Sequence, residues 1–418
     1  MIRARIEAVL DAIEADELGT NAFITVDRSG ALAGADAADD RRVRGRSLGP
    51  LDGQPVAVKD SLDTAGLRTT YGSGMYDSRV PGVDAVAVQR LQAAGAIVVG
   101  KTNLTEFACG TVGVNQWFGD VHNPHRHGFY PGGSSSGSAA AVAAGMVSLA
   151  LGTDTAGSIR HPAAVCGVVG LKPTLGRVPV DGNALIARNL DHVGPIASST
   201  DGAALVLEAI QDDRWGAVDL DLPDRPLRVG VLAGEFVDAC PSDVQAPFMA
   251  GVDLLRSEGH EVGEVYLDID LEEAEDHGAV LCMDMLEVHG HDIRSAPLDT
   301  IGPELLDWVN LFDSFDGDQY EDALKYQRSA VAIAEDVLAR WDVVVCPATR
   351  MPSGPLDTEE DRWLRVGNLA IWALTGQPSL TVPWGAAANG MPLGLLINGR
   401  RGTDSVVLAV GQLVERLR

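Results

Sequence analysis

The sequence contains the segment Pro131-Gly-Gly-Ser-Ser-Ser-Gly-Ser-Ala-Ala-Ala-Val-Ala-Ala-Gly145, in which a Gly/Ser-rich turn leads into a run of small residues. The run over Ser138–Met146 predicts a helix that belongs in a protein interior, because it has no polar face. A strand-like run at Ser148–Gly152 follows, and a second small-residue turn then ends on Ser158. The segment therefore predicts a buried helix packed beside strands.

Short strand-like runs alternate with helical ones on both sides of this segment. Strands alternating with helices favour a sheet that helices cover on both faces. Residues 28–53, rich in Gly, Ala, Asp and Arg, predict a surface connection, and 211–226 a linker. The predicted strands are 56–59, 97–99, 148–152, 227–232, 343–346 and 379–382, and the predicted helices include 85–94, 138–146, 243–257, 271–290, 320–340 and 404–417.

The composition indicates a globular protein. The 418 residues are 46% apolar and 22% charged, with a formal net charge of −27. Such a charge argues against nucleic acid and anionic membranes as partners, since phosphate binding needs clustered basic side chains. The five cysteines form no C-x-x-C pair, which favours free thiols in a reducing compartment. With no secretory or membrane-spanning segment in the pattern, we expect a cytoplasmic protein.

Lysine is rare in this chain. Only Lys59, Lys101, Lys172 and Lys325 occur, and the other basic side chains are arginines. Arginine keeps its proton in a protein, whereas a buried lysine can lose it. Lys59 ends the apolar run Pro55-Val-Ala-Val-Lys59, which would desolvate its ammonium group and lower its pKa. Lys59 is therefore a candidate base.

The two Gly/Ser turns and this lysine suggest a nucleophilic serine that works without a histidine base. Thr155, Ala156 and Gly157 have no large side chains that would obstruct their backbone N–H groups. These N–H groups could therefore bind a developing oxyanion. Gly133-Ser-Ser-Ser-Gly137 also fits G-x-S-x-G, the nucleophile elbow of α/β-hydrolases. That elbow requires a preceding strand, and a His/Pro/Gly loop stands there instead.

Long strings of this sequence resemble the amidase signature family of serine amidohydrolases. The likeness is strong over about 50–200, resumes in the tail, and is loose over 211–365. Besides the segment quoted first, it rests on Asp52-Gly-Gln-Pro-Val-Ala-Val-Lys-Asp60, Gly100-Lys-Thr-Asn-Leu-Thr-Glu-Phe-Ala108, Gly152-Thr-Asp-Thr-Ala-Gly-Ser-Ile-Arg160, Gly376-Gln-Pro-Ser-Leu-Thr-Val-Pro383 and Met391-Pro-Leu-Gly-Leu-Leu-Ile397.

The resemblance implies a fold and a site. The fold would be a single α/β/α sandwich domain, 1–418, around a large mixed, mostly parallel twisted sheet. Its core would be 50–210 and 366–418, with a variable substrate-pocket half at about 215–365. The implied site consists of a catalytic Ser–cis-Ser–Lys triad of Ser158, Ser134 and Lys59, an oxyanion hole at Thr155, Ala156 and Gly157, and supporting residues Ser135, Thr153, Asp154 and Arg160. Neither a metal nor an organic cofactor is implied.

The resemblance implies an amidohydrolase that cleaves a C–N bond of a small carboxamide, urea or carbamate through an acyl-serine intermediate. Ester hydrolysis is compatible with the same triad, and a homodimer stays open. One alternative is a glutamine-dependent amidotransferase subunit that works in a complex and is similar to the A component of the tRNA amidotransferase. His161 stands where those proteins often carry Gln, which weakens this reading without excluding it. The other alternative is a catalytically silent scaffold, which would have no use for a buried lysine.

The remaining histidines, lysines and aromatic residues give weaker indications of function. His122, His125 and His127 lie in a Pro-containing loop whose spacing matches no strong metal signature, so a surface loop is expected. Lys101 and Lys172 are expected to pair structurally with carboxylates. The aromatic side chains expected in the core or lining the substrate pocket are Trp308, Phe312, Trp363 and Trp372.

Overall fold

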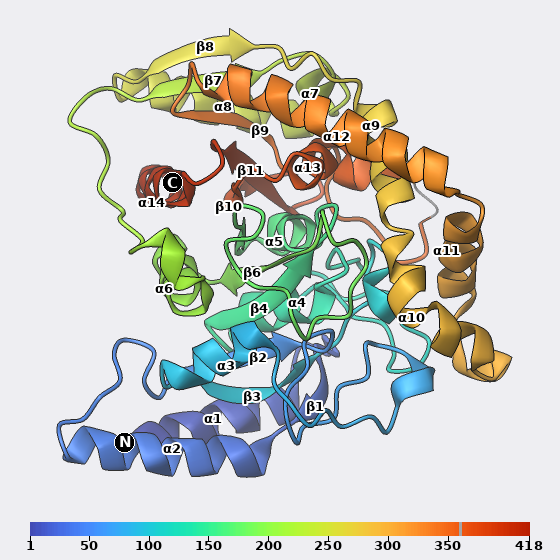
Figure 1. The fold of residues 1–418 in the computed structure, drawn as a ribbon. Coiled ribbons are helices and arrows are strands. Elements are labelled where there is room, and N and C mark those ends of the chain that lie inside the picture. The colour runs from blue at the N-terminus through green and yellow to red at the C-terminus, as the bar shows by residue number, and fades with distance from the viewer. Residues whose placement is uncertain (359–361) are drawn as a thin grey trace.

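One mixed sheet crosses the molecule (Figure 1). The computed structural model describes residues 1–358 and 362–418, with side chains for all of these except 362–364. Within that part, the strands lie in the order β1-β3-β2-β4-β6-β5-β10-β11-β9-β7-β8. They are β1 (Phe23–Val26), β2 (Pro55–Lys59), β3 (Ile97–Thr102), β4 (Leu149–Asp154), β5 (Val169–Lys172), β6 (His192–Ala197), β7 (Arg228–Leu232), β8 (Glu261–Val265), β9 (Val343–Pro347), β10 (Ser379–Ala386) and β11 (Pro392–Asn398).

The expectation of a mostly parallel sheet is wrong. Among the described strands, the parallel neighbours are β2–β3, β2–β4, β7–β8 and β7–β9, and the other six pairs are antiparallel. Parallel neighbours such as β2 and β3 need a crossover, which a helix provides, whereas β10 returns directly as β11 through a short turn. Buried strands of either kind are continuously apolar here, so the sequence pattern does not reveal their direction.

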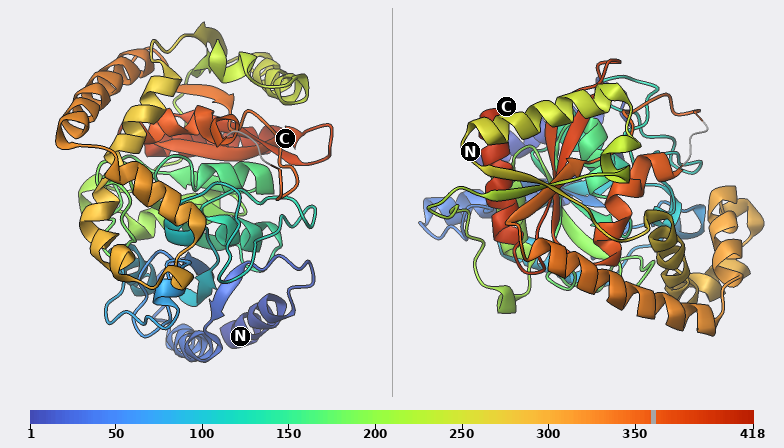
Figure 2. Two further views of the ribbon diagram at one scale, coloured as in Figure 1. Left: turned by 90° about the vertical axis from the view of Figure 1, so that its right-hand side faces the viewer. Right: turned by 90° about the horizontal axis from the view of Figure 1, so that it is seen from above.

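Helices cover both faces of the sheet (Figures 1 and 2). Val56 and Val58 of β2 face the layer of α3, α6, α8 and α14, while Ala57 faces α1, α2, α4 and α5. α9, α12 and α13 pack over the same second face at β9 and β11. The helices of these layers are α1 (Ile2–Ala15), α2 (Arg28–Val43), α3 (Val86–Ala93), α4 (Ser136–Ala143), α5 (Arg160–Cys166), α6 (Thr200–Ile210), α8 (Ser242–Ser257), α9 (Leu271–Leu281), α12 (Gly317–Leu338), α13 (Arg362–Leu374) and α14 (Asp404–Leu417).

Residues 28–53 are not simply a surface connection, because α2 occupies most of the segment. Ala31, Ala35 and Ala38 form a buried stripe of small side chains on one face of this helix. They lie in the same apolar cluster as Ile6 and Leu10 of α1. A stripe made of alanine gives little hydrophobic contrast, which explains why the pattern did not predict a helix.

The half expected to be variable does not form a separate sheet. Its strands β7, β8 and β9 extend the same sheet beyond β11. At the side of the molecule it adds α10 (Asp284–Ser295) and α11 (Pro303–Asp313). Residues 211–226 run between α6 and β7, with only a short 3₁₀ turn at Asp213–Trp215. Within the described chain, no helix combines the length and apolar character that crossing a membrane requires.

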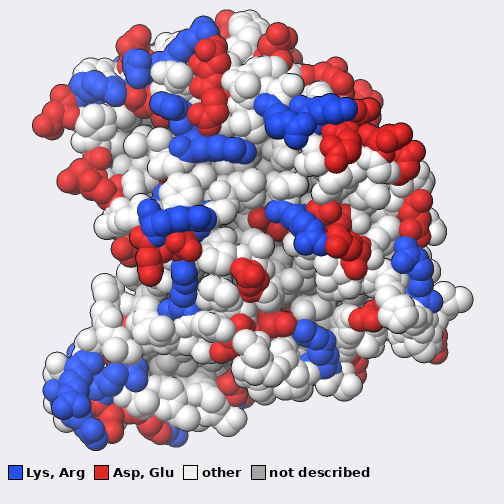
Figure 3. Space-filling model, viewed as in Figure 1, with Lys and Arg blue, Asp and Glu red and all other residues white. Residues whose placement is uncertain are grey.

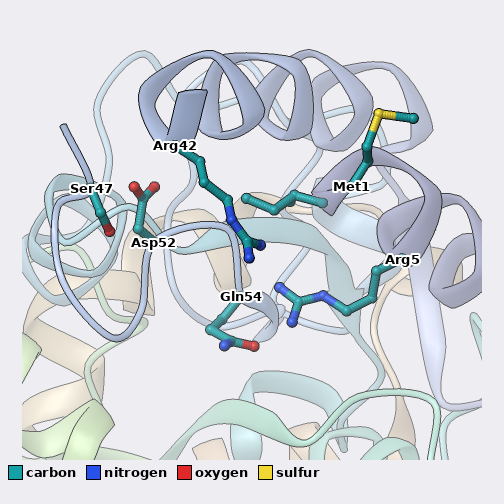
Figure 4. A pocket seen from close by; sticks show the side chains of 7 residues that line it. Met1, Arg5, Arg42, Ser47, Asp52 and Gln54 are labelled. Carbon is teal, nitrogen blue, oxygen red and sulfur yellow. The ribbon is translucent and has the colours of Figure 1, made fainter. Parts of the chain in front are cut away.

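The charge is unevenly distributed over the surface. On the face in Figure 3, acidic residues crowd the upper right, over α9 and α12. Basic residues gather at the lower left, around the end of α2. A surface concavity of about 400 Å³ lies there between α1, α2 and the loop before β2 (Figure 4). Arg5, Arg42 and Asp52 line it, and none of the residues expected at a catalytic site does.

Candidate active site

Lys59 lies at the end of the buried strand β2 and is fully buried. Its Nζ donates hydrogen bonds to Ser134 Oγ at 2.8 Å and to Thr153 Oγ1 at 2.7 Å. Burial lowers the pKa of Lys59 to about 7, although the charges of Asp154 and Asp191 oppose that shift. A lysine with this pKa exchanges its proton at neutral pH.

Ser134 belongs to the turn that precedes α4. The Gly133–Ser134 peptide bond is cis. In the same turn, Ser135 Oγ donates to the carbonyl of Thr153 at 3.1 Å, which ties the turn to β4. The Ser135 N–H donates to the carbonyl of Ser158 at 3.2 Å, so the two Gly/Ser turns are in direct contact.

Ser158 lies in the turn between β4 and α5, and the fully buried Asp154 organises this turn. The Asp154 carboxylate accepts the N–H groups of Gly157 at 2.8 Å and Ile159 at 3.1 Å. It also accepts two guanidinium bonds from Arg160, both at 2.9 Å. Burial opposes ionisation of Asp154, but the Arg160 guanidinium outweighs it and holds the pKa of Asp154 well below its usual range. The Ser158 hydroxyl makes no hydrogen bond within the described residues.

One of the three backbone N–H groups that the sequence suggested for an oxyanion hole already has a hydrogen-bond partner. The N–H of Gly157 is already used by Asp154, so it is not free to bind an oxyanion. Within the part of the chain that the structure describes, the N–H groups of Thr155 and Ala156 have no hydrogen-bond partner. Both residues line the same cavity as Ser158. Two of the three expected donors are therefore available beside the serine.

A small cavity of about 50 Å³ opens at Ser158. Its walls are mainly apolar and include Ile186, Trp308 and Phe312. A second cavity of about 40 Å³ shares Thr155, Ala156 and Trp308 with the first and continues between α9 and α13. Trp308 and Phe312 thus line the pocket, as one reading of the sequence expected. Trp372 is fully buried in the core, and the side chain of Trp363 lies outside the described residues.

The other polar candidates lie apart from these cavities. Lys101 is buried 3.4 Å from Asp60, a structural ion pair as predicted. Lys172 differs from its prediction, because its Nζ donates to the carbonyls of Pro173 and Gln377 and contacts His192. Among the described residues, no three His, Cys, Asp or Glu side chains are grouped so that they could hold a metal ion.

One polar residue beside the site was missed. Asp191 is buried just before β6 and accepts a hydrogen bond from Thr155. Its position depends on the pairing of β6 with β4, and β6 itself was not predicted. The apolar run after Asp191, interrupted by glycine and proline, was the available signal for that strand.

Comparisons with known proteins agree with this architecture. A model of the family named Amidase matches residues 4–408. The chain is 36% identical to the A component of the glutamyl-tRNA(Gln) amidotransferase of Roseiflexus sp. (strain RS-1), over 98% of this chain and 92% of that protein. It is 35% identical to AtzE, a component of the 1-carboxybiuret hydrolase of Pseudomonas sp. (strain ADP), over 98% and 93%.

The fold agrees as well. A solved structure described as an amidase superposes with a TM-score of 0.92 and 31% identity, over 100% of this chain and 96% of that one. The fold and these relatives define the chain as an enzyme that acts on a carbon–nitrogen bond. It belongs to the amidase signature family.

Proposed function

We propose that this enzyme hydrolyses an amide-type C–N bond through an acyl-Ser158 intermediate. The observation that carries the proposal is the buried Lys59, hydrogen-bonded to Ser134 and with a pKa lowered to about 7. A neutral amine in this position can accept a proton at neutral pH, which is what activation of a serine requires. The contact between the two serine turns supports Ser158 as the nucleophile.

The chemistry proceeds in two stages. Ser158 Oγ attacks the carbonyl carbon while its proton passes to Ser134, whose own proton passes to Lys59 Nζ. The N–H groups of Thr155 and Ala156 bind the oxyanion of the tetrahedral intermediate. Lys59 then returns its proton through Ser134 to the leaving nitrogen, and the C–N bond breaks. In the second stage water attacks the acyl carbon while its proton passes to the same relay; the bond from that carbon to Ser158 Oγ then breaks, Oγ takes the proton back and the acid leaves.

The lining of the cavity at Ser158 favours a substrate with a small apolar acyl group. No charged side chain lines the cavity at Ser158 among the described residues, whereas Ile186, Trp308 and Phe312 do. An apolar wall gains from burying an apolar group and penalises an unpaired charge. This argument favours an independent amidase whose substrate is an uncharged carboxamide, urea or carbamate.

A second candidate is an amidotransferase subunit that hydrolyses glutamine and passes ammonia to a partner. The comparisons support this candidate better than they support an independent amidase, because several curated relatives are A components of glutamyl-tRNA(Gln) amidotransferases. The relative AtzE is also named as one component of a larger enzyme. Both candidates use the same acyl-serine chemistry and differ in the substrate and in the need for a partner.

The first experiment is intact-protein mass spectrometry after treatment with an alkyl fluorophosphonate. We expect one adduct on the wild type and on Ser136→Ala, and none on Ser158→Ala. Ser136→Ala is the control because Ser136 is the first residue of α4, close in sequence to the Ser134 turn, and has no part in the proposed chemistry. Labelling of Ser158→Ala to the wild-type extent would contradict the proposal.

The two candidates are then separated by substrate and by partner. An independent amidase turns over apolar amides, ureas or carbamates as the purified chain and leaves glutamine intact. An amidotransferase subunit releases ammonia from glutamine, and tagged chain expressed in its native host copurifies with a partner in constant ratio. Glutamine turnover that depends on such a partner would replace the first candidate by the second.

A further inference from the structure

Strand pairing places Asp191 beside the turn that carries Ser158. β4 and β6 are antiparallel neighbours, and their pairing reaches Asp154 opposite His192 (Figure 1). The next residue after β4 is Thr155, and the residue before β6 is Asp191. Because the two strands run in opposite directions, these residues meet at the same end of the sheet.

Asp191 joins two walls of the cavity through its buried carboxylate. Thr155 Oγ1 donates to Asp191 Oδ1 at 2.7 Å. The N–H of Ile186 donates to Oδ2 at 2.9 Å, and the N–H of Ala187 to Oδ1 at 3.3 Å. Thr155 and Ile186 both line the cavity at Ser158. The Asp191 carboxylate therefore fixes the turn that contains Thr155 and Ser158 against the loop that contains Ile186 and Ala187.

The same strand pairing brings Asp191 towards Lys59, because Lys59 Nζ donates to Thr153 Oγ1 at 2.7 Å and Thr153 pairs with Val193, two residues after Asp191. Besides burial, the charged or titratable groups that shift the pKa of Lys59 are Asp154, Asp191 and Cys109. Asp154 is ion-paired with Arg160, whereas Asp191 forms no ion pair within the described residues. Burial raises the pKa of Asp191 to about 6, against the effect of its hydrogen bonds, so its carboxylate is mainly ionised above that pH.

We propose that Asp191 is a positioning residue of this active site, which holds the Thr155 hydroxyl in place and supplies a counter-charge to protonated Lys59. The inference rests on the proposed acyl-serine chemistry. In the acylation step the proton that leaves Ser158 ends on Lys59, and the ammonium formed there lies in the field of the Asp191 carboxylate. Asp191 itself exchanges no proton with the substrate.

The test follows the rate of fluorophosphonate labelling of Ser158 against pH, measured by intact-protein mass spectrometry. In the wild type, the rate falls as the pH falls through about 7, because Lys59 then holds a proton. Asp191→Asn removes the negative charge, so Lys59 loses its proton more easily. We expect the midpoint of the pH profile to move to lower pH by about one unit. We also expect the labelling rate on the alkaline side to drop about tenfold, because Thr155 is held less firmly.

Variants of Thr155 separate the two roles of Asp191, which are positioning of the Thr155 hydroxyl and counter-charge to Lys59. Thr155→Val loses the hydroxyl but leaves the charge, so we expect a rate loss of about tenfold with a much smaller movement of the pH profile. Thr155→Ser keeps the hydroxyl and should recover most of the rate. If Asp191→Asn is recovered only as aggregate, the two Thr155 variants still test the positioning role. Equal labelling rates in Thr155→Val and Thr155→Ser would overturn that role.

A distant carboxylate provides the matched control. Asp342 accepts a backbone N–H from Arg228 beside β7 and lies outside the site. Asp342→Asn should keep the wild-type pH profile. Labelling of Asp191→Asn with an unmoved profile, or one moved to higher pH, overturns the counter-charge role. Absence of labelling in the wild type is a different result, since it contradicts the proposed acyl-serine chemistry itself.

Discussion

At the scale of single residues, the environment of Lys59 determines what its amine can do. A fully buried ammonium is unfavourable, and the hydroxyls of Ser134 and Thr153 that contact it are uncharged. Lys101 is buried to the same degree on the neighbouring strand but has Asp60 as an ionic partner. Although the two lysines are similarly buried, Lys59 is therefore suited to proton exchange and Lys101 to a structural ion pair.

This difference predicts the effect of Lys59→Arg. Arginine stays protonated, so the variant lacks a base, and we expect labelling and hydrolysis at pH 8 to fall by roughly 10²–10⁴-fold. Lys325→Arg, on the exposed face of α12, is the control and should match the wild type. Rates within twofold of the wild type for Lys59→Arg would contradict the role of Lys59 as base.

At the scale of elements, α11 forms one side of the pocket through Trp308 and Phe312, and Glu106 anchors the start of this helix. The Glu106 carboxylate accepts the N–H of Gly302 at 2.8 Å, the hydroxyl of Ser73 at 2.5 Å and the indole N–H of Trp117 at 3.0 Å. Gly302 is the residue directly before α11. The carboxylate thus connects the helix that carries Trp308 and Phe312 to the loops beside β2 and β3.

The anchor predicts the effect of Glu106→Gln. Glutamine keeps one carbonyl oxygen as an acceptor, but its NH2 group replaces the other oxygen and faces a donor from which it cannot accept, so we expect the free energy of unfolding to fall by about 1–3 kcal/mol. Urea denaturation followed by circular dichroism measures this loss. Asp299→Asn, an exposed change a few residues before α11, should stay close to the wild type. Equal stability of the two variants would show that the three contacts do not hold the helix.

Trp308 predicts a change in selectivity, because it lies between the two cavities and lines both. Trp308→Ala should join them and admit longer acyl groups. With alkyl fluorophosphonates of increasing chain length, we expect the preference to shift towards longer chains by about tenfold or more. Leu311→Ala changes an exposed side chain on the same helix and should leave the preference unaltered. An unaltered preference in Trp308→Ala would place the acyl group elsewhere.

The elements also explain how far the sequence could predict this protein. Strongly apolar runs such as 343–346 were identifiable as strands, and small-residue strings placed Ser134 and Ser158 in turns. The alanine stripe of α2 and the exposed, partly charged strand β8 lack such contrast. Asp191 was beyond prediction, because its contact with Thr155 depends on the register between β4 and β6. Local patterns indicate elements, whereas register appears only when the sheet is assembled.

At the scale of the whole molecule, buried histidines make stability depend on pH. His289 packs edge-on against Tyr71 and Phe107, and burial lowers its pKa to about 4. An unfolded histidine takes up a proton below about pH 6.5. Between these values the unfolded chain binds the proton and the folded chain does not, so the free energy of unfolding falls as the pH falls.

His289→Leu isolates this contribution. For one such group the loss is about 1.4 kcal/mol per pH unit within the window. Urea denaturation at pH 6 and pH 5 should therefore show a smaller loss in the variant than in the wild type, by about that amount. The buried histidines His161 and His192 remain in both proteins and cancel in the comparison. Identical losses would mean that His289 gains its proton without unfolding.

The order of the parts along the chain has a consequence for how such an enzyme can diversify. The proposed bond-breaking groups all occur between Lys59 and Asp191, whereas α9 and α11, which supply much of the pocket wall, lie within 271–313. The two stretches are not interleaved in the gene. A recombination event or a laboratory graft confined to 271–313 could therefore exchange the recognised molecule and leave the reaction itself untouched.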